Sequence, residues 1–97
     1  MNSTLPTQVE ISPEALFQEL EGETVLLNLQ SERYYGLDDV GTRMWQLLAE
    51  NGDVAAAFTQ LLKEYAVDAG QLEADLAALI GRLAEAGLLT ITVPAGS

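Results

Sequence analysis

The sequence predicts an α+β domain in which a three-stranded antiparallel sheet precedes three helices. Short apolar runs separated by turn residues fill the chain up to Leu37, which is the pattern of strands joined by hairpins. Beyond that point apolar residues recur at helical spacing in three segments, and each segment begins beside an aspartate that can cap a helix. A chain of 97 residues is long enough for one domain with a modest core.

The first strands are predicted on either side of a glycine-centred turn. Residues 1–14 are expected to form an N-terminal tail, in which Gln8–Ser12 suits a short strand that ends before Pro13. Ala15–Leu20 and Thr24–Leu29 are two apolar runs, and we interpret them as a β-hairpin. Helix propensity alone also allows a helix at the first of these runs, but the run is short and adjoins a strong strand candidate.

Arg33–Leu37 is the third strand of this meander, which places it at an edge of the sheet. The unpaired N–H and C=O groups of such an edge can pair with an incoming peptide. The simpler interpretation is that Tyr34, Tyr35 and Leu37 are core and rim residues, because aromatic residues in strands usually pack. The register of the hairpin is open, and a shift by one residue exchanges the faces of the two tyrosines.

Helix start and stop signals then follow in order. The expected N-caps are Asp38 or Asp39, Asp53 and Asp68. Asp68 stands three residues before Gln71, as in a capping box. Gly52 and Gly87 are expected to end the first and third helices. Residues 90–97 are predicted to be a C-terminal tail, in which Thr90–Val93 suits a short strand.

Charge balance and missing residue types exclude several classes of function. Fifteen acidic and four basic residues give a net charge of −11, which disfavours binding to nucleic acids and to anionic membranes. A neutral or basic peptide is a more suitable partner, although an acidic surface also serves solubility alone. The sequence has no histidine and no cysteine, and its hydroxyl groups have no evident base beside them. We therefore expect no enzymatic activity, no metal and no cofactor.

Targeting signals are also lacking in the sequence. No apolar run is long enough to cross a bilayer, and the first residues do not have the basic and apolar regions of a signal peptide. The expected location is the cytoplasm. The expected state is a monomer, and a dimer formed through an edge strand stays open.

Three helices beside a small sheet also resemble a winged helix-turn-helix arrangement, so a DNA-binding regulator is an alternative. Its third helix would read the DNA. Between Gln71 and Glu85, however, this helix carries Glu73, Asp75 and Glu85 against Arg82 alone, whereas a helix that faces phosphates should be basic. DNA binding is therefore disfavoured. A structural subunit whose edge strand completes a larger complex is a further alternative.

Several segments, taken in order, resemble the PqqD-like family of peptide-recognition proteins. They are Gly22–Leu29, Arg33–Trp45, Leu72–Leu76 and Leu83–Leu89. The resemblance covers residues 15–89, which we take as the domain, and it depends on the order and spacing of the segments rather than on one motif. Tyr34-Tyr35-Gly36-Leu37 is most similar to the stand-alone leader-binding proteins of lasso-peptide pathways.

This resemblance implies a function in the biosynthesis of ribosomally synthesised and post-translationally modified peptides (RiPPs). Proteins of that family bind the leader of a precursor peptide as an added strand on their third strand, beside the third helix, and deliver it to a partner protease or cyclase. The residues expected to contact the leader are Arg33, Tyr34, Tyr35, Gly36, Leu37, Asp75, Leu76, Leu79, Arg82 and Leu83. Core packing is the simpler role for the three leucines of the helix, and a solvated surface suits Asp75 and Arg82 equally well.

Overall fold

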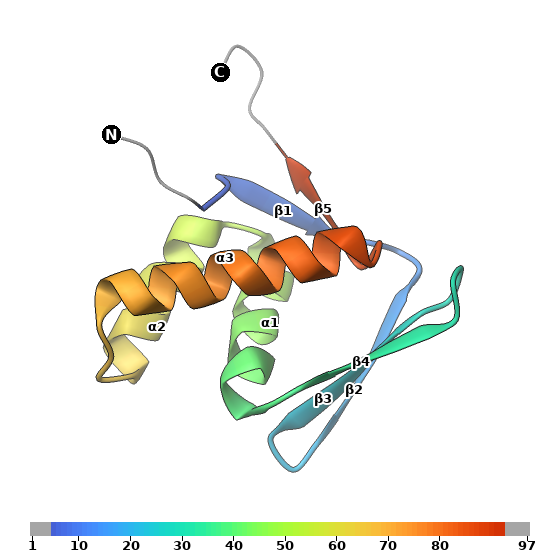
Figure 1. The fold of residues 1–97 in the computed structure, drawn as a ribbon, viewed down its shortest axis with the longest axis horizontal. Helices are drawn as coiled ribbons and strands as arrows, with labels where there is room; N and C mark the ends of the chain where they lie inside the picture. The colour runs from blue at the N-terminus through green and yellow to red at the C-terminus, as the bar shows by residue number, and fades with distance from the viewer. Residues whose placement is uncertain (1–4, 93–97) are drawn as a thin grey trace.

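In the computed structural model, which describes residues 5–92, a three-stranded sheet and a two-stranded sheet lie against three helices (Figure 1). The predicted order of three meander strands followed by three helices is confirmed. The elements are β1 (Gln8–Ile11), β2 (Ala15–Leu20), β3 (Glu23–Asn28), β4 (Arg33–Leu37), α1 (Asp39–Asn51), α2 (Val54–Glu64), α3 (Ala69–Glu85) and β5 (Leu89–Thr92).

A two-residue turn joins β2 and β3 in a tight hairpin. Leu20 pairs with Glu23, so only Glu21 and Gly22 form the turn. Both turn residues have positive φ, 51° and 84°, which is the backbone of a type I′ turn and matches the twist of the flanking strands. The strand prediction for Ala15–Leu20 is therefore confirmed over the helical alternative.

β4 pairs antiparallel with β3, and the strand order β2-β3-β4 leaves β4 at the edge, as predicted. Leu26 pairs with Tyr35 and is fully buried, which identifies the face of the sheet that lies on the helices. Because side chains alternate along a strand, Arg33 and Leu37 belong to this inner face together with Tyr35. Tyr34 belongs to the outer face.

β1 and β5 form a second, two-stranded antiparallel sheet that joins the two ends of the described chain (Figure 1). Each strand was expected from its own sequence, but their pairing was not, because they are far apart in the chain. Val9 of β1 and Leu89 of β5 are both buried, so these segments contribute to the core. Val93, which was included in the predicted terminal strand, lies outside the described residues.

Aspartate side chains cap all three helices, as expected. Each accepts a hydrogen bond from the backbone N–H three residues further on: Asp38 from Gly41, Asp53 from Ala56 and Asp68 from Gln71. Gly52 ends α1 in the left-handed conformation, with φ of 77°. A Cβ atom at this position would lie 2.2 Å from the carbonyl oxygen of Val9, so the absence of a side chain lets β1 approach the end of α1.

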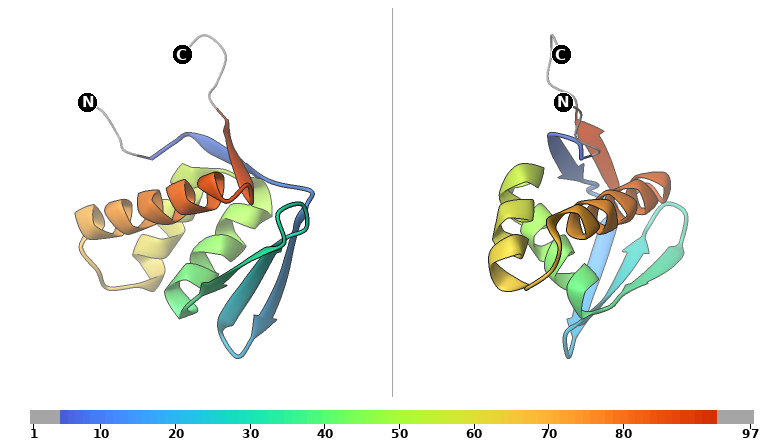
Figure 2. Two further views of the ribbon diagram at one scale, coloured as in Figure 1. Left: turned by 45° about the vertical axis from the view of Figure 1, so that its right-hand side comes forward. Right: turned by 60° about the vertical axis from the view of Figure 1, so that its left-hand side comes forward.

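The core lies between the inner face of the sheet and the three helices. Trp45 of α1 is fully buried, and its ring meets Phe17 of β2 edge to face, with centroids 5.6 Å apart. The buried hydroxyl of Thr24 in β3 donates to that of Thr42 in α1 at 2.9 Å. Figure 2 shows that the three-stranded sheet lies beside α1 and that α3 crosses in front of α1. No helix within residues 5–92 has the length and apolar character needed to span a membrane.

Candidate functional site

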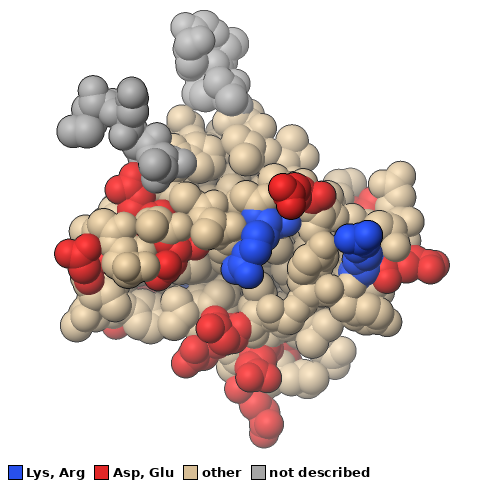
Figure 3. Space-filling view, in the orientation of Figure 1, with Lys and Arg blue, Asp and Glu red and all other residues tan. Residues whose placement is uncertain are grey.

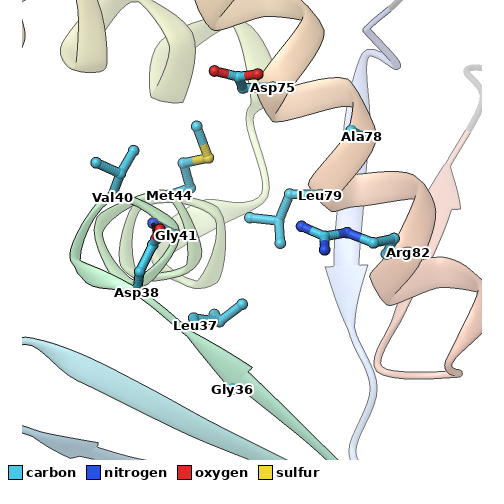
Figure 4. A pocket seen from close by; sticks show the side chains of 10 residues that line it. All are labelled: Gly36, Leu37, Asp38, Val40, Gly41, Met44, Asp75, Ala78, Leu79 and Arg82. Atoms are coloured by element: carbon cyan, nitrogen blue, oxygen red, sulfur yellow. Dashed lines mark hydrogen bonds between the residues drawn. The ribbon is translucent and has the colours of Figure 1, made fainter.

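A groove of about 550 Å³ lies between the free edge of the sheet and the helices (Figure 4). It is formed by the C-terminal end of β4, the first turns of α1 and one stripe of α3. Its lining residues are Gly36, Leu37, Asp38, Val40, Gly41, Met44, Asp75, Ala78, Leu79 and Arg82. Polar side chains stand at its borders, and the apolar side chains of Leu37, Met44 and Leu79 form its floor (Figure 4).

The contribution of α3 follows from its helical repeat. Asp75, Ala78, Leu79 and Arg82 are spaced i, i+3, i+4 and i+7, so they form one stripe along the helix. Leu79 is buried against the core, whereas the small side chain of Ala78 leaves space above it. In Figure 4 the guanidinium group of Arg82 reaches over the groove toward Leu79 and Leu37.

The inner and outer faces of β4 border two different surfaces of the protein. Leu37 is buried at the end of the groove, and Tyr35 is half-buried against the core. Gly36 borders the groove through its backbone, because it has no side chain. Tyr34 is 71% exposed and lines a separate shallow depression on the outer face of the sheet, together with Leu16 and other apolar side chains. The structure thus separates the two tyrosines, which the sequence could not do.

The other predicted site residues are divided between core and surface. Leu76 and Leu83 are fully buried in the core and do not line the groove, unlike Leu79. Arg33 lies at the start of β4, outside the groove lining, and its side chain is exposed. Gly36, Leu37, Asp75, Leu79 and Arg82 meet around the groove.

The N-cap and the first turns of α1 supply groove residues that the sequence did not indicate as part of the site. These are Asp38, Val40, Gly41 and Met44. Val40 and Met44 share a helical stripe in the sequence, but that stripe indicated only a core face. The signal that could have placed them was the direct passage from β4 into α1, because a helix that starts at the end of an edge strand must border that edge.

Both ends of β3 are fixed to the helices, and this fixes the position of β4. At one end, the hydroxyl of Thr42 bonds both the Thr24 hydroxyl and, at 3.5 Å, the carbonyl oxygen of Leu37. At the other end, Asn28 Nδ2 donates to the carbonyl oxygen of Ala86 at 2.7 Å, just beyond α3. Since Asn28 is the residue that pairs with Arg33, the start of β4 is held beside the C-terminal end of α3.

Clear shifts in pKa occur at an ion pair outside the groove. Arg43 of α1 donates two hydrogen bonds, of 2.8 and 2.7 Å, to the two carboxylate oxygens of Glu64 in α2. These bonds, with a further one from Gln60, lower the pKa of Glu64 to about 2, and the same pairing raises the pKa of Arg43. The ion pair connects two helices and does not border the groove.

The groove has the properties of a binding site. Within residues 5–92 no group of three histidine, cysteine, aspartate or glutamate residues could hold a metal ion. What the groove offers is a row of backbone groups along the strand edge, an apolar floor and charged borders. Such a combination suits an extended peptide that adds a strand to the sheet.

Two solved structures are similar to this chain. At 38% sequence identity and a TM-score of 0.78, the chain is similar to a structure described as "TbiB1 in Complex with the TbiA(beta) Leader Peptide", and the alignment covers 82% of this chain and 93% of that one. It is also similar to "Lasso peptide synthetase B1 complexed with the leader peptide", at 29% identity and a TM-score of 0.75, with 84% and 96% covered. A search of curated protein sequences gave no significant match.

Sequence comparison with protein families agrees with these structural similarities. Residues 23–89 match the family described as "Coenzyme PQQ synthesis protein D (PqqD)". The matched part runs from the start of β3 to the start of β5, so it includes both walls of the groove. The chain therefore belongs to the PqqD family.

Proposed function

We propose that this protein binds the leader segment of a precursor peptide and delivers it to a partner protease or cyclase in RiPP biosynthesis. The protein does not catalyse a reaction itself. The pathway that we propose is that of a lasso peptide. The leader adds a strand to the edge of β4 and places side chains into the groove beside α3. The main observation in support is that the free edge of β4 borders a groove with an apolar floor. The chain is also similar to two proteins that were solved with leader peptides.

The energetics of the groove support this mode of binding. A leader that is disordered in solution loses several kcal/mol of conformational free energy when it becomes a strand. Main-chain hydrogen bonds to β4 fix the register, but apolar contacts must offset most of that loss. Leu37, Met44 and Leu79 provide a continuous apolar surface for this purpose. Specificity then depends on which leader side chains reach that floor.

The edge of β4 also bears on the oligomeric state in which the protein binds its leader. A second copy paired along β4 would occupy the same backbone groups as the leader, so the active form is a monomer. It acts in the cytoplasm, where newly made precursor peptides are available. A DNA-binding function is not favoured, because the exposed surface of α3 presents Asp75 and Glu85 as well as Arg82.

Titration of the purified protein with the leader of its cognate precursor peptide tests the proposal. We expect saturable binding to the wild type and a strong loss of affinity in Ala78→Trp, because the new side chain fills the groove. Ala74→Trp is the matched control, since Ala74 is an exposed residue of the same helix outside the groove lining. If the folded wild type does not bind the leader, or if both variants lose affinity equally, the proposal is wrong.

A further inference from the structure

The charges around the groove are unevenly distributed along its length. At one end, Asp38 and Asp75 both line the groove, and Asp39 follows directly on the exposed start of α1. At the other end, Arg82 lines it, and Arg33 is the first residue of β4. In the space-filling view of this face, one basic patch lies on α3 and a second lies over the sheet toward the β3–β4 turn, and an acidic patch lies directly beside each of them (Figure 3).

Hydrogen bonds show that the two arginines belong to the same end. Asn28 pairs with Arg33 across β3 and β4, and its side chain bonds Ala86 at the end of α3. Ala86 lies one helical turn after Arg82. Arg33 also points to the inner face of the sheet, because it alternates with Tyr35 and Leu37. The start of β4, with Arg33, and the C-terminal part of α3, with Arg82, therefore lie at the same end of the space between the sheet edge and α3, and Arg82 lines the groove there.

The order of charges is the same along both walls. Asp75 and Arg82 are seven residues apart on α3, which corresponds to roughly 10 Å along the helix axis. On the other wall Arg33 and Asp38 are five residues apart, or roughly 16 Å of extended chain. Both walls thus pass from negative to positive in the same direction, over lengths that correspond to about three to five residues of an added strand.

Neither arginine is held in an ion pair by the part of the chain that the structure describes. The sequence has only four basic residues, and Arg43 is paired with Glu64. Among residues 5–92, neither Arg33 nor Arg82 forms an ion pair, even though Glu32 and Glu85 are close in sequence. In a chain with a net charge of −11, Arg82 in the groove lining and Arg33 at the start of β4 are therefore two cations that can attract an anionic group of a bound peptide.

We propose that the charge gradient selects the sequence and register of the bound peptide, an inference that rests on the proposed function. The bound peptide carries an aspartate or glutamate between Arg33 and Arg82. It carries a neutral or basic residue near Asp38 and Asp75, about four residues away along the strand. A peptide shifted by several residues would place its carboxylate against these aspartates, so charge repulsion rejects the wrong register.

Selection of a displayed library of random linear peptides on the immobilised protein provides the test. Peptides that bind the wild type but not Ala78→Trp are the groove binders. We expect them to be enriched in an acidic residue at one position, although the protein as a whole is strongly acidic. A synthetic peptide from this set should bind on the order of tenfold more weakly when its acidic residue is replaced by lysine.

Two charge-reversal variants distinguish an effect of the charge at the groove from an effect of the net charge of the protein. In Arg82→Glu the preference at the acidic position should invert toward lysine and arginine. Lys63→Glu changes the net charge by the same amount on the exposed surface of α2, away from the groove, and should leave the preference unchanged. An absence of acidic enrichment, or an equal response of both variants, overturns the charge proposal while peptide binding itself stands. If no groove-dependent peptide is selected, the proposed function fails as well.

Discussion

The side-chain nitrogen of Asn28 lies only 2.9 Å from the position that a Cβ atom at Gly87 would occupy. This approach allows Asn28 to bond the carbonyl oxygen of Ala86 and so to hold the sheet against the end of α3. Gly87 has a φ of 75°, and Leu88 turns back so that its N–H donates to the carbonyl oxygen of Leu83 at 2.9 Å. The end of α3 and the position of β4 therefore depend on one glycine.

Gly87→Ala should lower the free energy of unfolding by about 1–2 kcal/mol or more, because the left-handed backbone is strained for alanine and the new methyl group contacts Asn28. Gly81→Ala is the matched control within α3, where a Cβ atom would meet nothing within 4 Å. It should raise the free energy of unfolding by about 0.5–1 kcal/mol. Urea unfolding followed by the fluorescence of the single tryptophan measures both. Equal effects of the two variants would contradict the assigned role of Gly87.

Glu21→Asn should stabilise the protein by about 0.5–1 kcal/mol. Glu21 is the first residue of the type I′ turn between β2 and β3 and has a φ of 51°, a conformation that asparagine adopts more readily than glutamate. Glu23→Asn removes the same charge outside the turn and controls for the change in electrostatics. The denaturant midpoints of the two variants decide the matter, and a gain shared by both would indicate charge relief instead of turn geometry.

The Arg43–Glu64 pair should make stability depend on pH in a defined window. The pKa of Glu64 is lowered in the folded state from its usual 4.5 to about 2, so the folded state favours the carboxylate. The resulting stabilisation is present above pH 4.5 and is lost as the pH falls through 4.5 toward 2. Thermal unfolding of the wild type and Glu64→Gln should therefore differ at neutral pH and converge near pH 2. A melting-temperature difference that persists at the acidic limit would refute this assignment.

The elements of the fold could be predicted because each has a local cause. The aspartate caps, Gly52 and Gly87 specify the ends of helices within a few residues of sequence. The pairing of β1 with β5 could not be predicted, since it joins segments from opposite ends of the chain and no local signal specifies it. The register of β4 was undetermined for a related reason, because it depends on burial of Leu26 by distant helices.

The groove that we propose as the site lies beside the strand edge that the sequence indicated, but its lining residues were less predictable. A meander of three strands places the third at an edge, and this required no tertiary information. Which leucines of α3 face the groove depends on how far the helix is rotated about its axis, and Leu76, Leu79 and Leu83 are alike in sequence. The structure brings only Leu79 of these three to the groove, beside the small side chain of Ala78.

The separation of Tyr34 and Tyr35 leads to a prediction about the peptide. Tyr34→Ala should change stability by less than about 0.5 kcal/mol, because the side chain is 71% exposed on the outer face. Tyr35→Ala should cost about 2 kcal/mol, since the ring packs against the core. It should also weaken binding of the leader, because Tyr35 supports the inner face of β4 next to Leu37.

Unfolding curves and leader titrations of the two variants, carried out below their melting temperatures, provide the comparison. Tyr34→Phe and Tyr35→Phe remove only the hydroxyl groups and show whether hydrogen bonding or ring packing is responsible. Stronger loss of leader binding in Tyr34→Ala than in Tyr35→Ala would place the peptide over the outer face of the sheet. That result would contradict the groove as the binding site, because Tyr34 does not line it.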